Sequence, residues 1–238
     1  MNKQNFVFKA LKRVHHFFLT LSKTLSRKNL HTFLDHQFAG IPAGAIVANI
    51  GSGGKIEEQL RVWAQKTGFV VQSMDIDSDR HPDLICDITQ PDLPPDSFDV
   101  VVMAEVLEHV TDPHAAVRGI QHLLKPSGRL ILSVPFMFPI HDRPHDYFRY
   151  THYGLAYLFR GMDELTISAR NSWAEAINVL ASRLIMEKST SARLASPFAV
   201  SIAILLMPVV WLLGKLIKTD FITTGYTLTG KKPAQGQR

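Results

Sequence analysis

The chain has 238 residues, which is enough for one α/β domain with additions and short for two independent cores. Its hydrophobic content of 46% excludes wholesale disorder, and its single cysteine, Cys86, excludes an intrachain disulfide. The net charge of +5 is concentrated in residues 1–34, which contain seven Lys or Arg and no acid. The near-neutral remainder gives no broad electrostatic footprint, so nucleic acid is disfavoured as a partner.

The first predicted element is a basic amphipathic arm over residues 1–40. Apolar residues recur at helical spacing on one face, Val7, Leu11, Val14, Phe18, Leu21 and Leu25, and basic residues lie opposite, Lys9, Arg13, His16, Lys23 and Arg27. This apolar face either covers the domain or lies in a membrane interface. Residues 30–38 predict a second short helix. Because the start of the chain lacks a secretory signal pattern, we expect a cytoplasmic protein, peripheral at the inner membrane face.

Residues 41–238 predict one domain in which strands and helices alternate. Short apolar runs, as in parallel strands covered on both faces, lie at 45–50, 69–74, 84–86, 100–103 and 129–134. Helices are expected after residue 54, after the N-cap pair Asp112-Pro113 and after Thr151. Alternation at 165–169 and a segment rich in β-formers at 221–229 predict two further strands. The predicted fold class is α/β, a Rossmann-like, doubly wound and mostly parallel sheet.

An apolar insertion, about residues 190–218, precedes the last predicted strand. Its centre, 194–214, contains 21 residues without a charge, and a helix of that length would reach about 30 Å, the thickness of a bilayer core. Pro208 interrupts this stretch, and a membrane span would separate residues 221–229 from their sheet. We favour a helical hairpin or core insertion over an interfacial element, and either of these over a transmembrane helix.

Polar residues follow the first and second predicted strands. Gly51, Gly53 and Gly54 form a turn that lets the backbone approach a bound cofactor, and the next helix offers its unpaired N–H groups. Asp75, with Asp77 as the alternative, ends the second strand, where a carboxylate accepts hydrogen bonds from two ribose hydroxyls.

Residues 134–151 place two His, two Asp, two Arg and two Tyr directly behind the fifth strand, where open α/β sheets bind ligands. His141 and His145 are candidate general bases or acceptor-positioning groups, because imidazole titrates near working pH. Their spacing suits a metal site only on a helix, which Pro144 disfavours, so we expect no metal. Candidate acceptor contacts in the same loop are Asp146, Arg149 and Tyr150. The first two also suit an internal ion pair.

Three motifs resemble, in order and spacing, the class I S-adenosylmethionine-dependent methyltransferases: Ile46-Val-Ala-Asn-Ile-Gly-Ser-Gly-Gly54, residues 98–113 and Leu124-Lys-Pro-Ser-Gly-Arg-Leu130. The resemblance covers roughly residues 44–160, and the loop at 144–151 resembles a subgroup of that family. It implies S-adenosyl-L-methionine as cofactor, with contacts from Asn49, Gly51, Gly53, Asp75, Ile76, Asp87, Ile88 and Glu105. Family members commonly have an acid where Asn49 stands.

Within that resemblance, Asp87 would bond the adenine amino group, Ile76 and Ile88 would pack on its faces, and Glu105 would lie near the methionine end. Glu108 and His109 stand at a loop-to-helix junction. Structural hydrogen bonds are the favoured role for Glu108, and the role of His109 is open.

The predicted function is methyl transfer to a small-molecule, glycan or lipid-linked acceptor, at oxygen, nitrogen or carbon. Catalysis would rest mainly on alignment, with deprotonation where the acceptor needs it. Asn49 and the apolar insertion motivate an alternative, a non-catalytic membrane-associated module that keeps the fold. A nicotinamide-dependent oxidoreductase is disfavoured, because the glycine turn lacks the full G-x-G-x-x-G register.

Overall fold

A computed structural model describes residues 3–187 and 189–234, without the side chains of residues 3–12, 14 and 193. The strands are β1 Ile46–Ile50, β2 Val70–Asp75, β3 Leu84–Ile85, β4 Phe98–Ala104, β5 Leu124–Pro135, β6 Asp163–Ala169 and β7 Gly225–Lys231. The helices are α1 Lys3–Ala39, α2 Gly54–Thr67, α3 Pro113–Leu123, α4 His152–Leu158, α5 Trp173–Ser182, α6 Thr190–Leu205 and α7 Met207–Leu216. Short 3₁₀ turns cover Ser78–Arg80, Leu107–His109 and Arg183–Met186.

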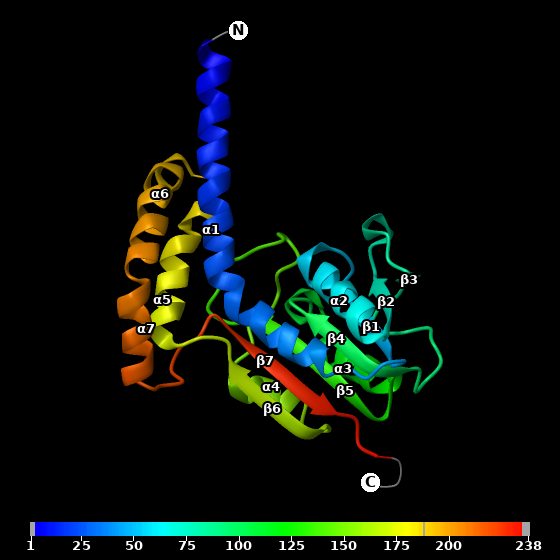
Figure 1. Cartoon of the computed structure of the whole chain (residues 1–238). Helices are drawn as coiled ribbons and strands as arrows, with labels where there is room; N and C mark the ends of the chain where they lie inside the picture. Colours follow the sequence, from blue (N-terminus) through cyan, green and yellow to red (C-terminus); the bar gives the residue numbers. More distant parts are fainter. Residues whose placement is uncertain (1–2, 188, 235–238) are drawn as a thin grey trace. The chain divides into compact units, whose positions relative to one another are not determined.

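The strands form one seven-stranded sheet in the order β3-β2-β1-β4-β5-β7-β6 (Figure 1). The first five strands pair in parallel, and β7 runs antiparallel to both β5 and β6. The predicted doubly wound, mostly parallel sheet is confirmed. The last strand begins at Gly225 rather than at residue 221, and it pairs inside the sheet between β5 and β6.

Local sequence signals position the helices that flank the sheet. Asp112 caps α3, because its side chain accepts a hydrogen bond from the backbone N–H of Ala115 at 2.9 Å. Thr151 caps α4 in the same way, through the N–H of Gly154 at 3.0 Å. Helix α2 ends at Gly68, whose left-handed conformation is typical of a helix C-terminus. The starts of α3 and α4 are those that the sequence predicted.

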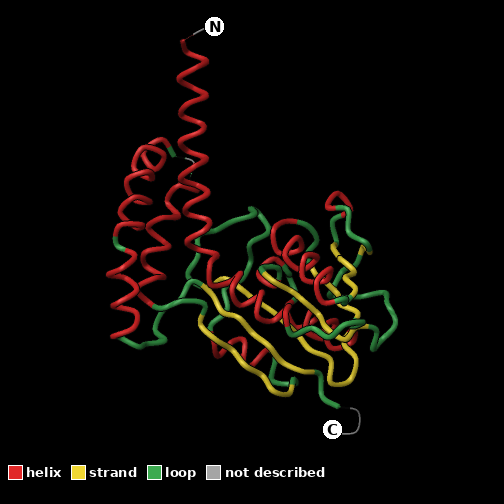
Figure 2. Tube along the Cα trace, viewed as in Figure 1, coloured by secondary structure: helices red, strands yellow, loops and turns green. Residues whose placement is uncertain are grey.

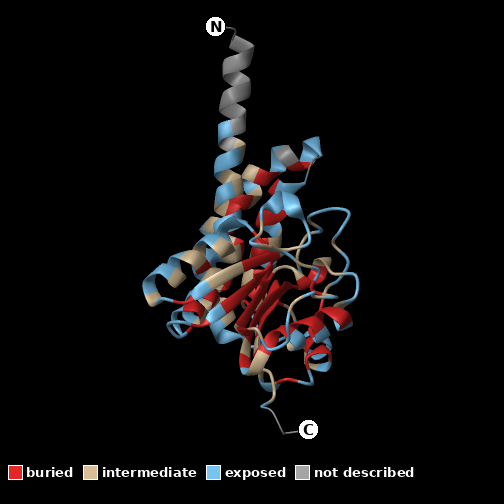
Figure 3. Ribbon diagram, turned by 90° about the vertical axis from the view of Figure 1, so that its right-hand side faces the viewer, coloured by how far each residue is buried: buried red, intermediate tan, exposed pale blue. Residues whose placement is uncertain are grey.

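Both faces of the sheet are covered, so its central strands are almost fully buried (Figure 3). One core cluster contains Met103 of β4, Ile120 of α3 and Leu155 of α4. The cluster on the other face contains Leu34 of α1 and Leu60 of α2. Continuous apolar strands between two helical layers are the physical reason for a parallel sheet here.

Helix α1 is one continuous element, so the prediction of two helices in the arm was wrong. No Gly or Pro occurs between Lys3 and Ala39, and nothing therefore interrupts the backbone hydrogen bonds. The second half of the helix packs on the sheet through residues that are completely buried, Leu30, Leu34 and Phe38. The predicted face at Val7, Leu11 and Val14, and Lys9 opposite it, lies outside the described side chains.

The chain divides into two compact units. The sheet unit comprises Leu30–Phe136, Ile140–Ala169 and Gly225–Arg238, and the helical unit comprises Met1–Asn29, Met137–Pro139 and Arg170–Thr224. These limits differ from the predicted arm of 1–40 and insertion of about 190–218, for two reasons. The second half of α1 belongs to the core of the sheet unit, and α5 packs with α6 and α7.

The described residues of the helical unit are helices and loops, whereas the strands belong to the sheet unit (Figure 2). Inside the helical unit, α1 and α5 approach closely through small side chains: the hydroxyl of Ser22 donates to the carbonyl of Ser182 at 3.0 Å. Asn178 of α5 donates to the carbonyl of Ala203 in α6 at 2.8 Å. Trp173 donates its indole N–H to the carbonyl of Ile217, just after α7, at 3.1 Å.

Among the described residues, no single helix is long and apolar enough to cross a membrane. Helices α6 and α7 meet that criterion only when taken together, and they are bent by 55° at the break between them. The uncharged stretch 194–214, which the sequence showed to be interrupted at Pro208, is therefore two helices, and α7 starts at Met207, immediately before that proline. Proline is tolerated in the first turn of a helix, where its missing N–H is not needed.

Candidate active site

The carboxyl ends of β1, β2 and β4 lie at one edge of the sheet, because these neighbouring strands are parallel. The chain passes from β1 to β2 on one side and returns to β4 on the other, which is the position where open α/β sheets bind ligands. The loops after β1 and β4 touch: a Cβ added to Gly51 would lie 2.4 Å from Cγ2 of Val106. Gly51 also has a φ of +91°, so both geometry and space require glycine.

The turn after β1 leaves room on its outer side. Gly53 and Gly54 have φ values of +85° and +74°, and an added Cβ at either position would meet nothing within 4 Å. The buried amide of Asn49 donates to the carbonyl of Gly51 at 3.2 Å and so stabilises the turn from within. A carboxylate could not donate that bond, which gives the departure from the family pattern a structural role. We name Asn49, Gly51, Gly53, Asp75 and Asp87 the cofactor edge.

Asp75 connects the second strand to this turn. Its Oδ2 accepts from the N–H of Ser52 at 2.8 Å, and its Oδ1 accepts from the N–H of Asp77 at 2.9 Å. Each carboxylate oxygen has two lone pairs, so both oxygens retain capacity for ribose hydroxyls. Asp77 is half exposed and caps the 3₁₀ turn that follows, by accepting from the N–H of Asp79. Asp75 is therefore the better placed of the two predicted carboxylates.

The predicted adenine contacts have different surroundings. Asp87 is exposed, and its Oδ1 accepts from both the N–H and the hydroxyl of Thr89, at 2.8 and 2.7 Å. Ile76 is 69% exposed, as a face for a ligand would be, whereas Ile88 is buried in the core. A Cβ on Gly119 of α3 would lie 1.9 Å from the carbonyl oxygen of Ile88, so this helix packs directly against the loop. The adenine roles of these residues stay predictions.

Sequence reasoning missed a polar network behind the glycine turn. Glu57 of α2 accepts from the N–H of Gly53 at 2.6 Å and pairs with Arg61 at 2.7 Å. Arg61 also contacts Asp83 at 2.9 Å, and Asp83 accepts from the N–H of Ser73. That backbone bond, with Arg61, lowers the pKa of Asp83. The i,i+4 pair of Glu57 and Arg61 was the signal in the sequence.

Glu105 follows β4 with a positive φ of +57°, which is uncommon for a residue other than glycine. Its N–H donates to the carbonyl of Ser133 in β5 at 2.9 Å, and its carboxylate accepts from the hydroxyl of the same residue at 3.0 Å. The neighbouring strand thus fixes both the backbone and the side chain of Glu105 at the carboxyl edge of the sheet. Its predicted role near the methionine end of the cofactor stays a prediction.

Glu108, His109 and His141, which we name the Glu-His cluster, come together from the loops after β4 and β5. Oε1 of Glu108 lies 3.7 Å from Nε2 of each histidine. The carboxyl group is completely buried, and neither of its oxygens has a hydrogen-bond partner among the described residues. Burial, opposed by His141 and reinforced by Glu105, raises the pKa of Glu108.

The loop after β5 holds His141 in place through a half-buried ion pair. Arg149 contacts Asp146 through two hydrogen bonds of 2.5 and 2.6 Å, and Asp146 accepts from the backbone N–H of His141 at 2.9 Å. Against the effect of burial, these partners lower the pKa of Asp146 to about 2. Burial acts to lower the pKa of His141, but Glu108 and Asp146 outweigh it, so that pKa is raised. Asp146 and Arg149 thus form the internal ion pair that the sequence left open.

Two other predicted residues lie around the cluster. His145 is exposed, its Nδ1 lies 2.9 Å from the hydroxyl of Tyr147, and its backbone carbonyl is 2.7 Å from Nδ1 of His109. Tyr150 is buried, and its hydroxyl donates to the carbonyl of Leu107 at 3.1 Å. The structure therefore joins His141 to His109 rather than to His145. The signal that was undervalued is the Glu108-His109 pair directly after an apolar strand.

A cavity of about 620 Å³ lies elsewhere, at the amino ends of β1, β4 and β5. Its lining includes Gly44, Asp99 and Arg129, none of which the sequence predicted as a site residue. Parallel sheets bind ligands at the carboxyl ends of their strands, so the candidate site is the opposite edge.

Comparison with known proteins identifies the fold and the family. Residues 25–161 match the family model of the methyltransferase domain, and the chain therefore belongs to that family. A SAM-dependent methyltransferase of Archaeoglobus fulgidus has 16% identity and a TM-score of 0.56, covering 91% of this chain and 99% of that one. Phosphoethanolamine N-methyltransferase 2 of Haemonchus contortus, solved with S-adenosylhomocysteine, has 14% identity and a TM-score of 0.58, covering 86% and 52%. These two likenesses show the fold.

A ubiquinone biosynthesis O-methyltransferase of Xanthomonas axonopodis pv. citri is 37% identical over 105 residues. The matched part is 39% of this chain and 44% of that protein, so the chain spans less than half of the relative's length. The predicted class of S-adenosylmethionine-dependent methyltransferases and its cofactor are confirmed. The open turn at Gly53 and the remaining lone pairs of Asp75 fit such a cofactor.

Proposed function

We propose that this chain transfers a methyl group to a hydroxyl oxygen of a small-molecule acceptor. The observation that carries the proposal is the Glu-His cluster, which adjoins the cofactor edge through the contact between the loops after β1 and β4. S-adenosylmethionine supplies the methyl group on a sulfonium. The residues of the chain must then align the acceptor and remove its proton.

The proton balance assigns a role to His109. The acceptor O–H bond breaks, its oxygen bonds to the methyl carbon, and the carbon–sulfur electron pair goes to sulfur. The backbone carbonyl of His145 can only accept, so Nδ1 of His109 carries the hydrogen and Nε2 bears a lone pair that can take up the proton. Such general-base assistance is worth about 10²–10⁴ in rate.

Oxygen is the favoured acceptor atom, because relatives named as O-methyltransferases match 105 and 104 residues of the chain. The experiment is transfer of a labelled methyl group to phenolic, alcoholic and amine acceptors, and to fractionated cell extract, with the product bond identified by mass spectrometry. We expect an O-methyl ether. A labelled N- or C-methyl product would overturn the assignment, and tight cofactor binding without any transfer would favour the non-catalytic module.

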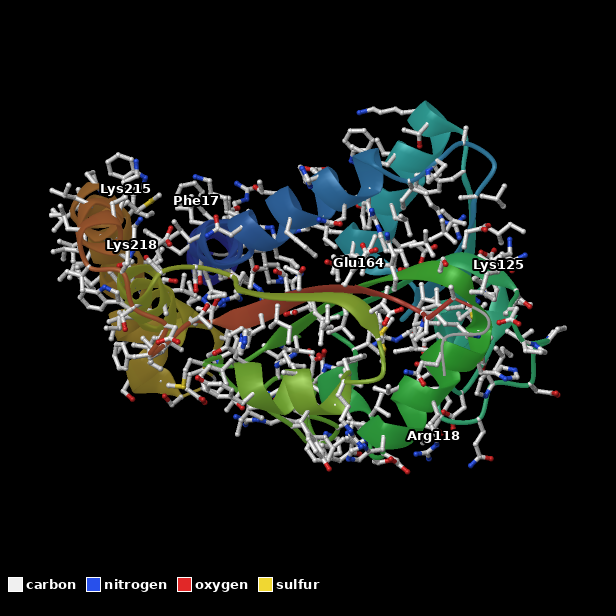
Figure 4. All side chains as sticks on the ribbon, turned by 90° about the horizontal axis from the view of Figure 1, so that it is seen from below. Phe17, Arg118, Lys125, Glu164, Lys215 and Lys218 are labelled. Atoms are coloured by element: carbon white, nitrogen blue, oxygen red, sulfur yellow. The ribbon has the colours of Figure 1, made fainter. Side chains whose placement is uncertain are left out.

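We also propose that the helical unit binds an anionic membrane surface. Large apolar side chains are exposed along α6 and α7, at 55–77%: Leu194, Phe198, Ile202, Leu205, Trp211 and Leu216. Such a surface is unusual for a soluble monomer and is typical of an interaction site. Figure 4 shows Phe17, Lys215 and Lys218 on this unit.

Charge selects the occupant of this apolar surface. The helical unit contains thirteen Lys or Arg and three acids, whereas the sheet unit contains thirteen Lys or Arg and eighteen acids. A basic, apolar surface fits anionic lipid, because each basic residue near such a membrane contributes about 1 kcal/mol. A second copy of the chain would have to bring two strongly basic units together. Cytoplasmic location at the inner membrane face follows from the same proposal.

Vesicle sedimentation tests the membrane proposal. We expect binding to vesicles with 30% anionic lipid, roughly, and loss of that binding as salt screens the charges. Trp211→Ser and Lys218→Ser should each weaken it, whereas Arg118→Ser, which removes an exposed base from α3 of the sheet unit, should not. Equal binding to neutral vesicles at high salt, or concentration-dependent dimerisation through Trp211 without vesicle binding, would contradict the proposal.

A further inference from the structure

The Glu-His cluster has the composition and spacing of a metal site. One carboxylate oxygen of Glu108 and one ring nitrogen each of His109 and His141 all lie within 4.8 Å of one another. Glu108 and His109 come from the 3₁₀ turn after β4, and His141 comes from the loop after β5. Two imidazoles and one carboxylate form the ligand set of many catalytic zinc sites.

The orientation of both imidazoles supports this inference. Nδ1 of His109 donates to the backbone carbonyl of His145 at 2.7 Å, so Nε2, which faces Glu108, is the atom that can ligate. Nδ1 of His141 lies 3.3 Å from the carboxylate of Asp146, and its Nε2 also faces Glu108. Metal-bound histidines characteristically donate their other ring nitrogen to a carbonyl or carboxylate in this way.

The surroundings of the buried Glu108 carboxylate distinguish a metal site from an ordinary ion pair. Direct charge-assisted hydrogen bonds have N–O distances of about 2.7–2.9 Å, whereas both histidines stand 3.7 Å from Oε1. Ligands bound tetrahedrally at about 2.0–2.1 Å lie about 3.4 Å apart, which is close to the observed spacing. A carboxyl group that is completely buried without a hydrogen-bond partner among the described residues is costly unless something else satisfies it.

We propose that Glu108, His109 and His141 bind one divalent transition-metal cation of the zinc type. Three protein ligands leave a further coordination position, as in catalytic rather than structural sites. Resting on the proposed function, we assign that position to the acceptor hydroxyl oxygen. The charge of the cation would lower the pKa of the hydroxyl, so that its proton leaves to solvent and Nε2 of His109 serves as a ligand instead of a base. The acceptor class is then a hydroxyl compound able to ligate a metal.

The test is binding of Zn²⁺ alone to the full chain after treatment with a chelator. We expect one equivalent by calorimetry and elemental analysis, and an absorption spectrum of the Co²⁺ form typical of nitrogen and oxygen ligands. Glu108→Gln and His109→Ala should each lower the affinity at least about 100-fold, and Asp146→Asn about 10–100-fold through loss of support for His141. His145→Ala should retain the metal, because only the backbone of that residue supports His109.

Stoichiometric binding that survives Glu108→Gln, or no binding to the folded wild-type chain, would overturn the proposal. Loss of the metal in His145→Ala would point to a different ligand set and overturn it as well. Thermal unfolding of each metal-free variant identifies any that fails to fold, and Glu108→Gln, which conserves shape, is the primary variant. Methyl transfer measured on the same samples separates the two proposals: a bound metal without transfer sinks only the function, and chelator-resistant transfer without a metal sinks only the site.

Discussion

At the cofactor edge, both oxygens of Asp75 accept hydrogen bonds from the backbone of the chain itself, whereas both oxygens of Glu108 in the Glu-His cluster have no hydrogen-bond partner among the described residues. Asp75 ends β2 and Glu108 follows β4, parallel strands with β1 between them. They differ in exposure: the Asp75 side chain is 11% exposed and that of Glu108 is completely buried. The Asp75 carboxylate is therefore partly accessible to solvent, whereas that of Glu108 is not.

This difference shows which group is preorganised and which depends on a ligand. The backbone bonds of Asp75 hold the glycine turn in shape before any cofactor arrives, so cofactor binding requires little rearrangement. Burial of the Glu108 carboxyl group costs free energy that no hydrogen bond among the described residues offsets. Unsatisfied buried groups of that kind concentrate at functional sites. The cofactor edge therefore behaves as a scaffold with spare acceptors, and the Glu-His cluster as a site that its ligand completes.

The largest effect is expected from Glu108→Gln. Loss of the carboxylate should lower turnover by about 10²–10⁴, because neither a base nor a cation at His109 would then be supported. Cofactor affinity should be unchanged, since the cofactor edge makes no use of this group. Steady-state kinetics and calorimetry with S-adenosylhomocysteine measure the two quantities. Asp142→Asn is the matched control, because that acid stands 3.9 Å from the same histidine but is 72% exposed. An equal loss of turnover in Glu108→Gln and Asp142→Asn would contradict a special role for the buried carboxylate.

Asp75→Ala should weaken cofactor binding at the cofactor edge. Loss of a charged acceptor costs about 1.5–3 kcal/mol, so the affinity for S-adenosylhomocysteine should fall roughly ten- to hundredfold. Asp77→Ala removes the cap of a surface turn and should change it far less. Calorimetry on both folded variants decides between them. A larger loss in Asp77→Ala would transfer the ribose role to that residue.

The cofactor edge was readable from the sequence because its signals are local. A strand, a glycine turn and a helix follow one another over residues 46–67, and Asp75 ends the next strand, so chain order alone places them. The caps at Asp112 and Thr151 are local in the same sense. The extent of α1 was not local in this sense. The spacing of Leu30, Leu34 and Phe38 suggested a separate helix, whereas the structure buries all three against the sheet as part of α1.

The Glu-His cluster could not be predicted in the same way, because His141 lies more than thirty positions after Glu108 and His109. His141 and His145 share a loop and invite a pairing, but the fold of that loop turns the carbonyl of His145, not its ring, toward His109. The partner of His141 is supplied by the turn after β4, through the pairing of β4 with β5. No spacing rule contains that information.

The ion pair of Asp146 should make the free energy of unfolding depend on pH in the acid range. The pKa of Asp146 is lowered to about 2, so its contribution to stability is complete above the ordinary pKa of 3.8 and is lost as pH falls toward 2. The contribution is about 2 kcal/mol, of which about half should be lost by pH 3. Denaturant unfolding of the wild type and Asp146→Asn should show a gap that narrows between pH 6 and pH 3. A gap independent of pH would mean that Asp146 does not act through its charge.

The smallest effect is expected from Tyr150→Phe, and it tests whether the surroundings of the cluster are structural. The buried hydroxyl donates to the carbonyl of Leu107, and burial raises the pKa of Tyr150, so the group stays protonated and engaged. Its loss should lower the free energy of unfolding by about 1 kcal/mol and leave the acceptor KM unchanged. Tyr153→Phe, at a residue that is 78% exposed, should change neither. A raised KM with unchanged stability would instead make Tyr150 the acceptor contact that the sequence predicted, and would extend the ligand-dependent half of the site to this residue.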